Sequence, residues 1–201
     1  MRKIALIVAA GAFALALISC GGSTSTASKA DAAPTVPAKP TIPADVQSAA
    51  EAALGSETEV LVYGDLAKNG HQEALAINRL NSTPQTPVAG TAATRAVVIE
   101  NDAGQWKELF RCDEYLKNTV GFLGGTPLSP VAGWRLQYEQ DAEKGLELYF
   151  TPLAKPAGGY VQTISVRWNP KVKRYQSLDR NFEQFLGEVS ALETPQLQLA
   201  R

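Results

Sequence analysis

The sequence predicts a mainly β protein, in which two four-stranded antiparallel meanders pack as a sandwich-like domain with short flanking helices near residues 44–54 and 181–190. Eight short segments between residues 59 and 178 alternate apolar and polar side chains, the period of a half-buried strand. Gly, Pro, Asn and Asp separate these segments, which fall into two similar sets of four. Helical spacing of apolar residues lies on either side of them.

The first 19 residues have the pattern of a secretion signal. Arg2 and Lys3 precede an uncharged apolar run that ends at Ile18. The run is short for a permanent transmembrane helix, and the small polar stretch after it has no stop-transfer pattern. We therefore expect residues 1–19 to direct export, with a single-span anchor as the alternative.

The end of this signal is similar to a lipoprotein processing site. Leu17, Ile18, Ser19 and Cys20 resemble the lipobox of bacterial lipoproteins. The resemblance implies that Cys20 becomes the N-terminus and carries acyl chains such as palmitate, each buried methylene contributing about 0.8 kcal/mol to membrane binding. Gly21 stands where inner-membrane lipoproteins of the enteric type usually carry Asp. This implies a lipid-anchored envelope protein, in the outer membrane if the source has two membranes, with its head in the periplasm or at the surface.

The composition is that of an ordinary globular protein. Hydrophobic residues make up 45% of the chain and charged residues 19%, with a formal net charge of −1. Nucleic-acid binding needs a concentrated basic surface, so it is not expected here. Once Cys20 is assigned to lipid, Cys112 has no partner for an intramolecular disulfide. Stability must therefore come from a hydrophobic core.

A spacer separates the anchor from the folded part. Residues 20–43 are rich in Ser, Thr, Ala and Pro, and Pro34, Pro37, Pro40 and Pro43 recur at every third position. This spacing favours an extended polyproline-II tether at about 3.1 Å per residue. We expect a single globular β-rich domain over residues 44–190 and a flexible C-terminal tail over 191–201.

Two segments have helical spacing. The first has apolar residues at helical intervals and Gly55 placed to end the helix; these residues are Val46, Ala49, Ala50, Ala53 and Leu54. The second follows the i, i+3, i+4, i+7 pattern with Phe182, Phe185, Leu186 and Val189. We expect each helix to cover an edge or an open end of the β structure.

Eight segments have strand patterns, namely 59–64, 73–79, 95–101, 105–111, 133–139, 146–152, 161–168 and 174–178. In each set of four, the first two strands flank an acidic turn that ends in glycine, Gly70 in one and Gly145 in the other. The offset of about seventy residues indicates a diverged internal duplication; the alternative is that any two meanders look alike. Two meanders cannot close a propeller, so they must face each other across one core.

One turn carries a ligand-like spacing. Residues 60–77, VLVYGDLAKNGHQEALAI, resemble a degenerate FG-GAP/VCBS repeat, in which a calcium loop joins two strands. The resemblance implies that Asp65, Asn69 and Glu73 are the candidate calcium ligands. Ala67 occupies a ligand position without a side-chain oxygen, whereas calcium takes about six to eight oxygens. We therefore expect side-chain turn bonds at this loop, and neither a metal nor a cofactor.

The chain lacks the usual motifs of catalysis. The single histidine, His71, lies in that turn, and neither a G-x-S-x-G nor an H-E-x-x-H motif is present. No catalytic residue is predicted. Adjacent Asp113 and Glu114 are typical of the start of a helical turn, and Cys112 is typical of a small buried side chain. A hydrolase using Asp113, Glu114 or Glu139 is the alternative.

The remaining candidates are aromatic. Trp134, Tyr160 and Trp168 lie on predicted strands, where a core or cross-strand role is expected for aromatic residues. The alternative is a binding role, for which Trp168 is the candidate because it adjoins the turn at Asn169 and Pro170 and is the most open of the three to exposure. An anchor, a spacer and a head without catalytic motifs predict a membrane-anchored envelope lipoprotein with a non-catalytic binding domain. Its expected partners are the lipid bilayer and an envelope protein or polymer. The alternative is an extracytoplasmic hydrolase.

Overall fold

The computed structural model describes residues 41–80, 89–154 and 161–188, all of which belong to one unit, Pro40–Arg201. Four predicted features lie outside the described residues: the signal (1–19), the lipid acceptor Cys20, nearly all of the tether (20–43) and the tail (191–201). Tyr160 also lies outside them.

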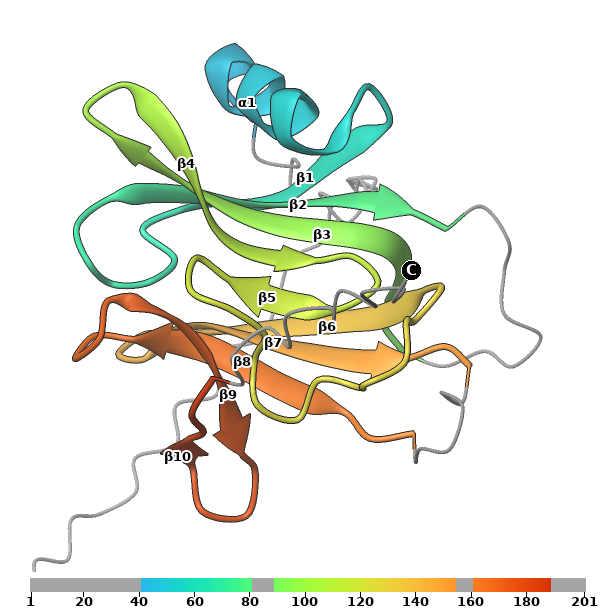
Figure 1. Ribbon diagram of the computed structural model, residues 1–201. Helices are drawn as coiled ribbons and strands as arrows, with labels where there is room; N and C mark the ends of the chain where they lie inside the picture. The colour runs from blue at the N-terminus through green and yellow to red at the C-terminus, as the bar shows by residue number, and fades with distance from the viewer. Residues whose placement is uncertain (1–40, 81–88, 155–160, 189–201) are drawn as a thin grey trace, which may run out of the picture. The chain divides into compact units, whose positions relative to one another are not determined.

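The described residues form one antiparallel sheet of ten strands with one short helix (Figure 1). In chain order the strands are β1 (Thr58–Gly64), β2 (Gln72–Arg79), β3 (Thr91–Asp102), β4 (Gln105–Cys112), β5 (Leu116–Asn118), β6 (Trp134–Asp141), β7 (Gly145–Pro152), β8 (Ile164–Asn169), β9 (Arg174–Asp179) and β10 (Gln184–Phe185). All eight predicted strands are confirmed. The sequence pattern missed β5 and β10 because two or three residues are too few to display a period.

The first helix, α1 (Ala44–Leu54), is confirmed with its predicted bounds. Its buried face, Val46, Ala50 and Leu54, packs against apolar side chains of β1, β2 and β3, so it covers a face of the sheet and not an edge. The helix ends at Gly55, whose φ of 97° is accessible to glycine at little cost. The Arg111 guanidinium donates a hydrogen bond to the carbonyl of Ala53 (3.2 Å), which satisfies one of the last helical acceptors.

The second predicted helix, over 181–190, is wrong. After β9 the chain turns and returns as β10, where Gln184 and Phe185 pair with Asp179 and Leu178; residues 189–190 lie outside the described part. Glu183 has a φ of 50°, which no right-handed helix accommodates. Phe182, expected on a buried helix face, is 70% exposed. The apolar residues of this segment therefore have helical spacing by coincidence, and the segment forms a short hairpin.

A branch at β3 joins the two halves. Residues 96–102 of β3 pair with β4, whereas residues 91–93 pair with β6. The strand order along the sheet is therefore β1-β2-β3-β6-β7-β8-β9-β10, with β4 and β5 branching off β3. This pairing joins the two predicted sets of four strands into one continuous antiparallel sheet.

One core draws on both halves of the sheet. It contains buried side chains from β2 to β9 together with Leu66 and Leu123 from loops. Phe110 of β4 lies 5.3 Å from Phe150 of β7 and 6.0 Å from Tyr175 of β9, measured between ring centroids. These aromatic contacts link residues far apart in the chain and bury large apolar areas.

Candidate functional site

The loop whose sequence resembles a calcium site is held by hydrogen bonds of its own side chains. Asp65 Oδ1 accepts a bond from the Asn69 amide (3.0 Å), and Asn69 Oδ1 accepts one from the His71 amide (2.9 Å). The Asn69 side-chain amide donates to Glu100 Oε2 at 2.9 Å. Gly70, with a φ of 87°, completes the turn. Within the described ranges, no group of three or more His, Cys, Asp or Glu side chains is placed to hold a metal ion.

Glu73, the third candidate ligand, is fully buried. Its Oε2 accepts hydrogen bonds from the backbone amides of Leu66 (2.6 Å) and Ala67 (2.9 Å). Burial raises the pKa of this carboxyl to about 7, and these backbone bonds oppose the rise. Glu73 therefore ties the turn to β2, and each of the three candidate ligands makes hydrogen bonds within the protein.

Trp168, the candidate binding aromatic, is buried, which is the core role and not the exposed alternative. Only 8% of it is accessible, and its ring packs edge-on against Tyr175 with centroids 5.5 Å apart. Val166 and Trp168, two residues apart on β8, both point to the core side of the sheet. The alternation of the strand therefore buries Trp168 even though it is next to a turn. Cys112 is 1% exposed, and burial raises the pKa of its thiol.

The three carboxyls of the hydrolase alternative are not brought together. Asp113 accepts a bond from the Tyr115 amide and pairs with Lys117 (both 3.0 Å), in a bend before β5 instead of the expected helical turn. Glu114 is exposed. Glu139 lies on β6, directly opposite Glu147 of β7.

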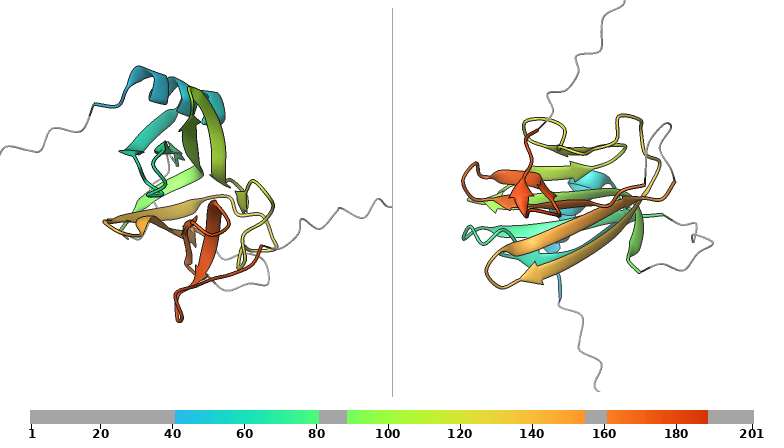
Figure 2. Two further views of the ribbon diagram at one scale, coloured as in Figure 1. Left: turned by 90° about the vertical axis from the view of Figure 1, so that its left-hand side faces the viewer. Right: turned by 90° about the horizontal axis from the view of Figure 1, so that it is seen from below.

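Glu139 does lie at a concave surface, which we call the outer groove. It consists of three adjoining cavities. Two, of about 200 and 260 Å³, lie on the side of β6–β9 that faces away from the core. The third, of about 450 Å³, lies next to them beside Gly124, Gly125 and the turn after β9. Figure 2 shows these strands side by side, coloured yellow to red. Arg180, at the turn after β9, lines all three cavities. Polar and aromatic side chains predominate in the two smaller ones, including Gln137, Tyr138, Glu139, Tyr149, Thr163 and Ser165.

The register of the sheet places these side chains. Tyr149 of β7 lies opposite Gln137 of β6 and opposite Ser165 of β8, so the three form a row across the strands. Burial and the nearby carboxylates of Glu147 and Glu139 raise the pKa of Tyr149 to about 12, so its phenol keeps its proton. Ser165 Oγ is buried and has no hydrogen-bond partner among the described residues.

Most charges in the outer groove are paired. Arg167 pairs with Glu147 at 3.5 Å, and Lys144 pairs with Glu183 at 3.3 Å. The Arg180 guanidinium instead lies over the ring of Tyr149, 5.5 Å from its centroid, and makes no ion pair with a described residue. Its hydrogen-bond donors are therefore available to a ligand.

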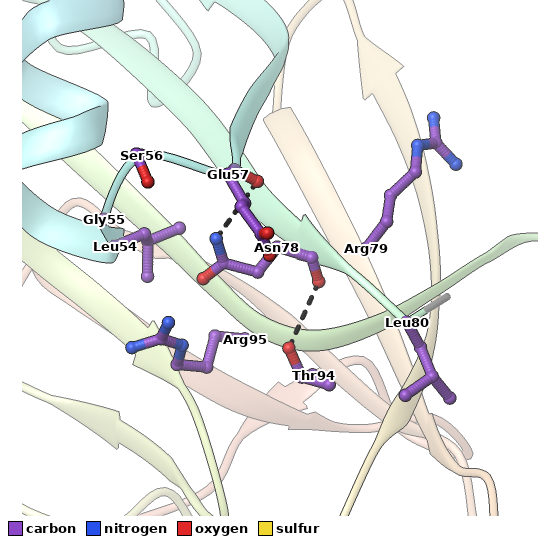
Figure 3. A pocket seen from close by; sticks show the side chains of 9 residues that line it. All are labelled: Leu54, Gly55, Ser56, Glu57, Asn78, Arg79, Leu80, Thr94 and Arg95. Atoms are coloured by element: carbon purple, nitrogen blue, oxygen red, sulfur yellow. Dashed lines mark hydrogen bonds between the residues drawn. The ribbon is translucent and has the colours of Figure 1, made fainter. Parts of the chain in front are cut away.

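A second concave surface, the helix-end cavity, lies between the end of α1 and the paired strands β2 and β3 (Figure 3). Its volume is about 580 Å³. The lining residues are Leu54, Gly55, Ser56, Glu57, Asn78, Arg79, Leu80, Thr94 and Arg95. Its two arginines differ in their surroundings, because Arg79 pairs with Glu59 and Arg95 has no ion pair with a described residue.

Comparison with known proteins gives no match to a family model, to a curated protein or to a solved structure. Among the described residues, no helix is both long enough and apolar enough to cross a membrane. Function must therefore be argued from the geometry of the two surfaces.

Of the groove residues, sequence reasoning singled out only Glu139. The signal for the others was present in the alternation of 146–152, where Glu147, Tyr149 and Thr151 stand between buried residues. That alternation shows which side chains share a face, but it does not show which strands lie next to each other. The neighbouring contributions of β6, β8 and the turn after β9 became visible only in the assembled sheet.

Proposed function

We propose that this protein is a membrane-anchored envelope lipoprotein whose β-rich head is a non-catalytic binding domain. The lipobox resemblance at Cys20 and the proline-spaced tether support the anchor. The outer groove supports binding of a partner protein or an extracytoplasmic polymer, because its cavities adjoin one another across neighbouring strands and suit an extended ligand.

The observation that carries this proposal is the arrangement of Arg180 over Tyr149. A cation stacked on an aromatic ring is a rigid pair with an apolar face and free hydrogen-bond donors. Hydrogen bonds to a charged group typically contribute about 1.5–3 kcal/mol. Arginine and tyrosine are also enriched among the residues that dominate binding energy at interfaces.

Arg180→Gln tests the groove. We expect the variant head to capture at least about tenfold less partner from an envelope extract than the parent, because it loses the unpaired cation. Capture is quantified on immobilised head protein by mass spectrometry. The matched control is Arg95→Gln, which removes another arginine without an ion pair from a different surface and should leave capture unchanged. Equal capture by the parent and Arg180→Gln would refute the role of the groove.

The alternative function is an extracytoplasmic hydrolase. Its support is that Glu139 and Glu147 lie directly opposite each other on adjacent strands at the outer groove. A glycosidase places two carboxyls on either side of a bond, and in this chain Glu147 is also engaged by Arg167. Recovery of the captured ligand distinguishes the functions. The binding proposal expects intact ligand, whereas cleavage that stops in Glu139→Gln would establish the hydrolase.

The anchor is tested by Cys20→Ala. We expect the variant to remain unprocessed or to leave the membrane fraction, because Cys20 is the only lipid acceptor that the lipobox resemblance implies. Membrane partitioning is measured by fractionation and immunoblotting, with Cys112→Ala as the control thiol variant. Normal cleavage and unchanged partitioning of Cys20→Ala would contradict the lipoprotein proposal.

We also propose that the two halves of the sheet are a sandwich-like arrangement that arose by duplication. Each half consists of four strands followed by a short fifth strand, β5 in one and β10 in the other, which pairs with the fourth. An experimental structure in which β1–β5 superpose on β6–β10 in the same order and orientation would support this origin. Different strand directions or spacings after superposition would count against it.

A further inference from the structure

Hydrogen-bonding side chains line the outer groove in rows that cross β6, β7 and β8. Alternate residues of a strand share a face, and the register of the sheet aligns them between strands. One row is Gln137, Tyr149 and Ser165, the next is Glu139, Glu147 and Arg167, and beside the first row the hydroxyls of Thr151 and Thr163 are hydrogen-bonded to each other at 2.7 Å. Each of these side chains can donate or accept a hydrogen bond. A ligand in the groove therefore meets mainly polar groups.

The two smaller cavities of the groove lack the apolar centre of a protein interface. Among the described residues that line them, the one aliphatic side chain is Leu178, which is only 7% exposed. The core of a protein–protein interface is instead apolar and depleted in charged residues. β7 is also paired on both sides, with β6 and with β8, so its backbone cannot accept an added peptide strand. A ligand here must be recognised through its own polar groups.

Opposite charges in the groove largely neutralise one another. Arg167 is paired with Glu147, and Lys144 with Glu183. Arg180 and Glu139 make no ion pair with a described residue, and both line the cavity of about 260 Å³ together with Tyr149. The Arg180 guanidinium lies 5.5 Å from the centroid of the Tyr149 ring. A polyanion would be attracted by Arg180 but repelled by Glu139, and a polycation would meet the reverse, so the groove favours a ligand without net charge.

The groups that remain open to solvent include donors and acceptors next to each other. The exposed amide of Gln137 supplies both, the Arg180 guanidinium donates from a planar fork, and the exposed carboxylate of Glu139 accepts. A hydroxyl group is itself a donor and an acceptor, so a ligand with neighbouring hydroxyls can satisfy all three side chains without carrying a charge. Sugars have this arrangement in every unit.

We infer that the outer groove binds a neutral polysaccharide, whose hydroxyl groups form hydrogen bonds with Gln137, Glu139 and Arg180. This inference rests on the proposed function, because it names the class of polymer that the binding domain takes. The three cavities adjoin one another across β6–β9 and the turn after β9, so they suit consecutive units of a chain better than a single small molecule.

Calorimetric titration of the full chain with neutral hexasaccharides tests the inference. The probes are cellohexaose, maltohexaose and chitohexaose. We expect saturable binding of at least one, with an affinity that changes less than about twofold between about 50 mM and about 500 mM NaCl, because a neutral ligand has no charge for salt to screen. No saturable heat with any of the three at about millimolar concentration would overturn the inference. Tighter binding of hexagalacturonate than of its neutral methyl ester would also overturn it, since the ligand would then be a polyanion.

Paired variants locate the contacts. Gln137→Ala and Arg180→Gln should each weaken binding of the hexasaccharide at least about tenfold. Their controls are Gln105→Ala, at an exposed glutamine of β4, and Arg95→Gln at the helix-end cavity, which should both bind within about twofold of the parent. Unchanged binding in both groove variants, or equal losses in Gln137→Ala and Gln105→Ala, would overturn the assignment to the groove. All four changes are at exposed side chains, and circular dichroism melting curves confirm folding before titration.

Treated envelope extracts separate this inference from the proposed function. Periodate cleaves the bond between two neighbouring hydroxyl-bearing carbons of a sugar into two aldehydes and is itself reduced to iodate. Capture by the parent head should fall at least about tenfold after periodate treatment of the extract and should survive protease treatment. Capture that survives periodate but is lost after protease would overturn the inference and leave the binding domain in place. No capture from untreated extract would count against the proposed function, and the hexasaccharide titration would still decide the inference.

Discussion

Glu73 is a carboxyl that the fold removes from water while leaving one of its oxygens unused. Oε2 holds the turn at Leu66 and Ala67, but Oε1 is buried without a hydrogen-bond partner among the described residues. The hydroxyl of Tyr175, whose pKa is raised mainly by burial and further by Glu73 and Glu100, is also buried and unpartnered. The ionised form of Glu73 is therefore poorly solvated, so deprotonation of this residue should destabilise the fold.

Stability should fall as pH rises through the titration of Glu73. The folded-state pKa is raised from 4.5 to about 7, so the folded state binds the proton more tightly than the unfolded chain does. This contribution is present in full below about pH 4.5 and is lost by about pH 8, a difference of roughly 3 kcal/mol. Glu73→Gln keeps an acceptor for the two amides and carries no charge, so its unfolding free energy should lack this decline.

Urea unfolding at pH 5 and pH 8 measures the effect. His71→Gln, an exposed change on the same loop, should keep the decline of the parent protein. The same decline in Glu73→Gln and the parent would show that other groups, such as the nearby Glu100, carry the pH dependence.

At the scale of elements, the two turns that the sequence analysis compared with each other are in contact. The amide of Leu146, at the start of β7, donates to the carbonyl of Leu66 in the β1–β2 loop at 2.7 Å. Gly145 has a φ of 80°, and a β-carbon there would overlap the Leu66 carbonyl oxygen. The absence of a side chain at residue 145 therefore allows one half of the sheet to approach the other.

Gly145→Ala should lower the free energy of unfolding by about 3 kcal/mol or more, since it combines left-handed strain with an overlap against backbone. Gly104→Ala is the control, because Gly104 has a similar φ of 88° but open space where the β-carbon would lie. It should cost only about 1–2 kcal/mol. Urea unfolding compares the two variants. Equal losses of unfolding free energy would show that the backbone at Leu66 moves aside without a measurable energetic cost.

At the scale of the whole described unit, the two halves share one core and should unfold together. Phe150 of β7 lies 5.3 Å from Phe110 of β4 and 6.1 Å from Trp134 of β6, between ring centroids. Removing a large buried ring destabilises a core by about 3–5 kcal/mol. Because the core is continuous, we expect strands far from the substitution to lose stability by the same amount.

Phe150→Ala tests this coupling. Hydrogen exchange should show the most protected amides of β2 and of β7 losing the same protection, about 3–5 kcal/mol each. Phe182→Ala, at a residue that is 70% exposed, should change neither by more than about 0.5 kcal/mol. Loss of protection confined to β6–β9 would mean that the halves unfold separately.

Much of the fold could be predicted because local patterns record burial. The helix over 44–54 and the eight longer strands follow from which side chains must face a core. The same reasoning failed at 181–190, where a short hairpin imitated helical spacing, and the alternative of an exposed Trp168, suggested by its closeness to a turn, was wrong. At Trp168 the alternation of β8 decided burial, and at 181–190 pairing with Leu178 and Asp179, directly before the segment, formed a hairpin where a helix was expected.

The sequence by itself determined the strand segments, the first helix, the glycines of the turns and the two alternating faces of each strand, because these depend on neighbours along the chain. Only the tertiary structure decided that β3 pairs with both β4 and β6, that Glu73 is buried, and that Arg180 lies over Tyr149. Each of these depends on contacts between residues that are far apart in the chain. Alternation specifies a face for a side chain but not the strand or loop that will lie against it.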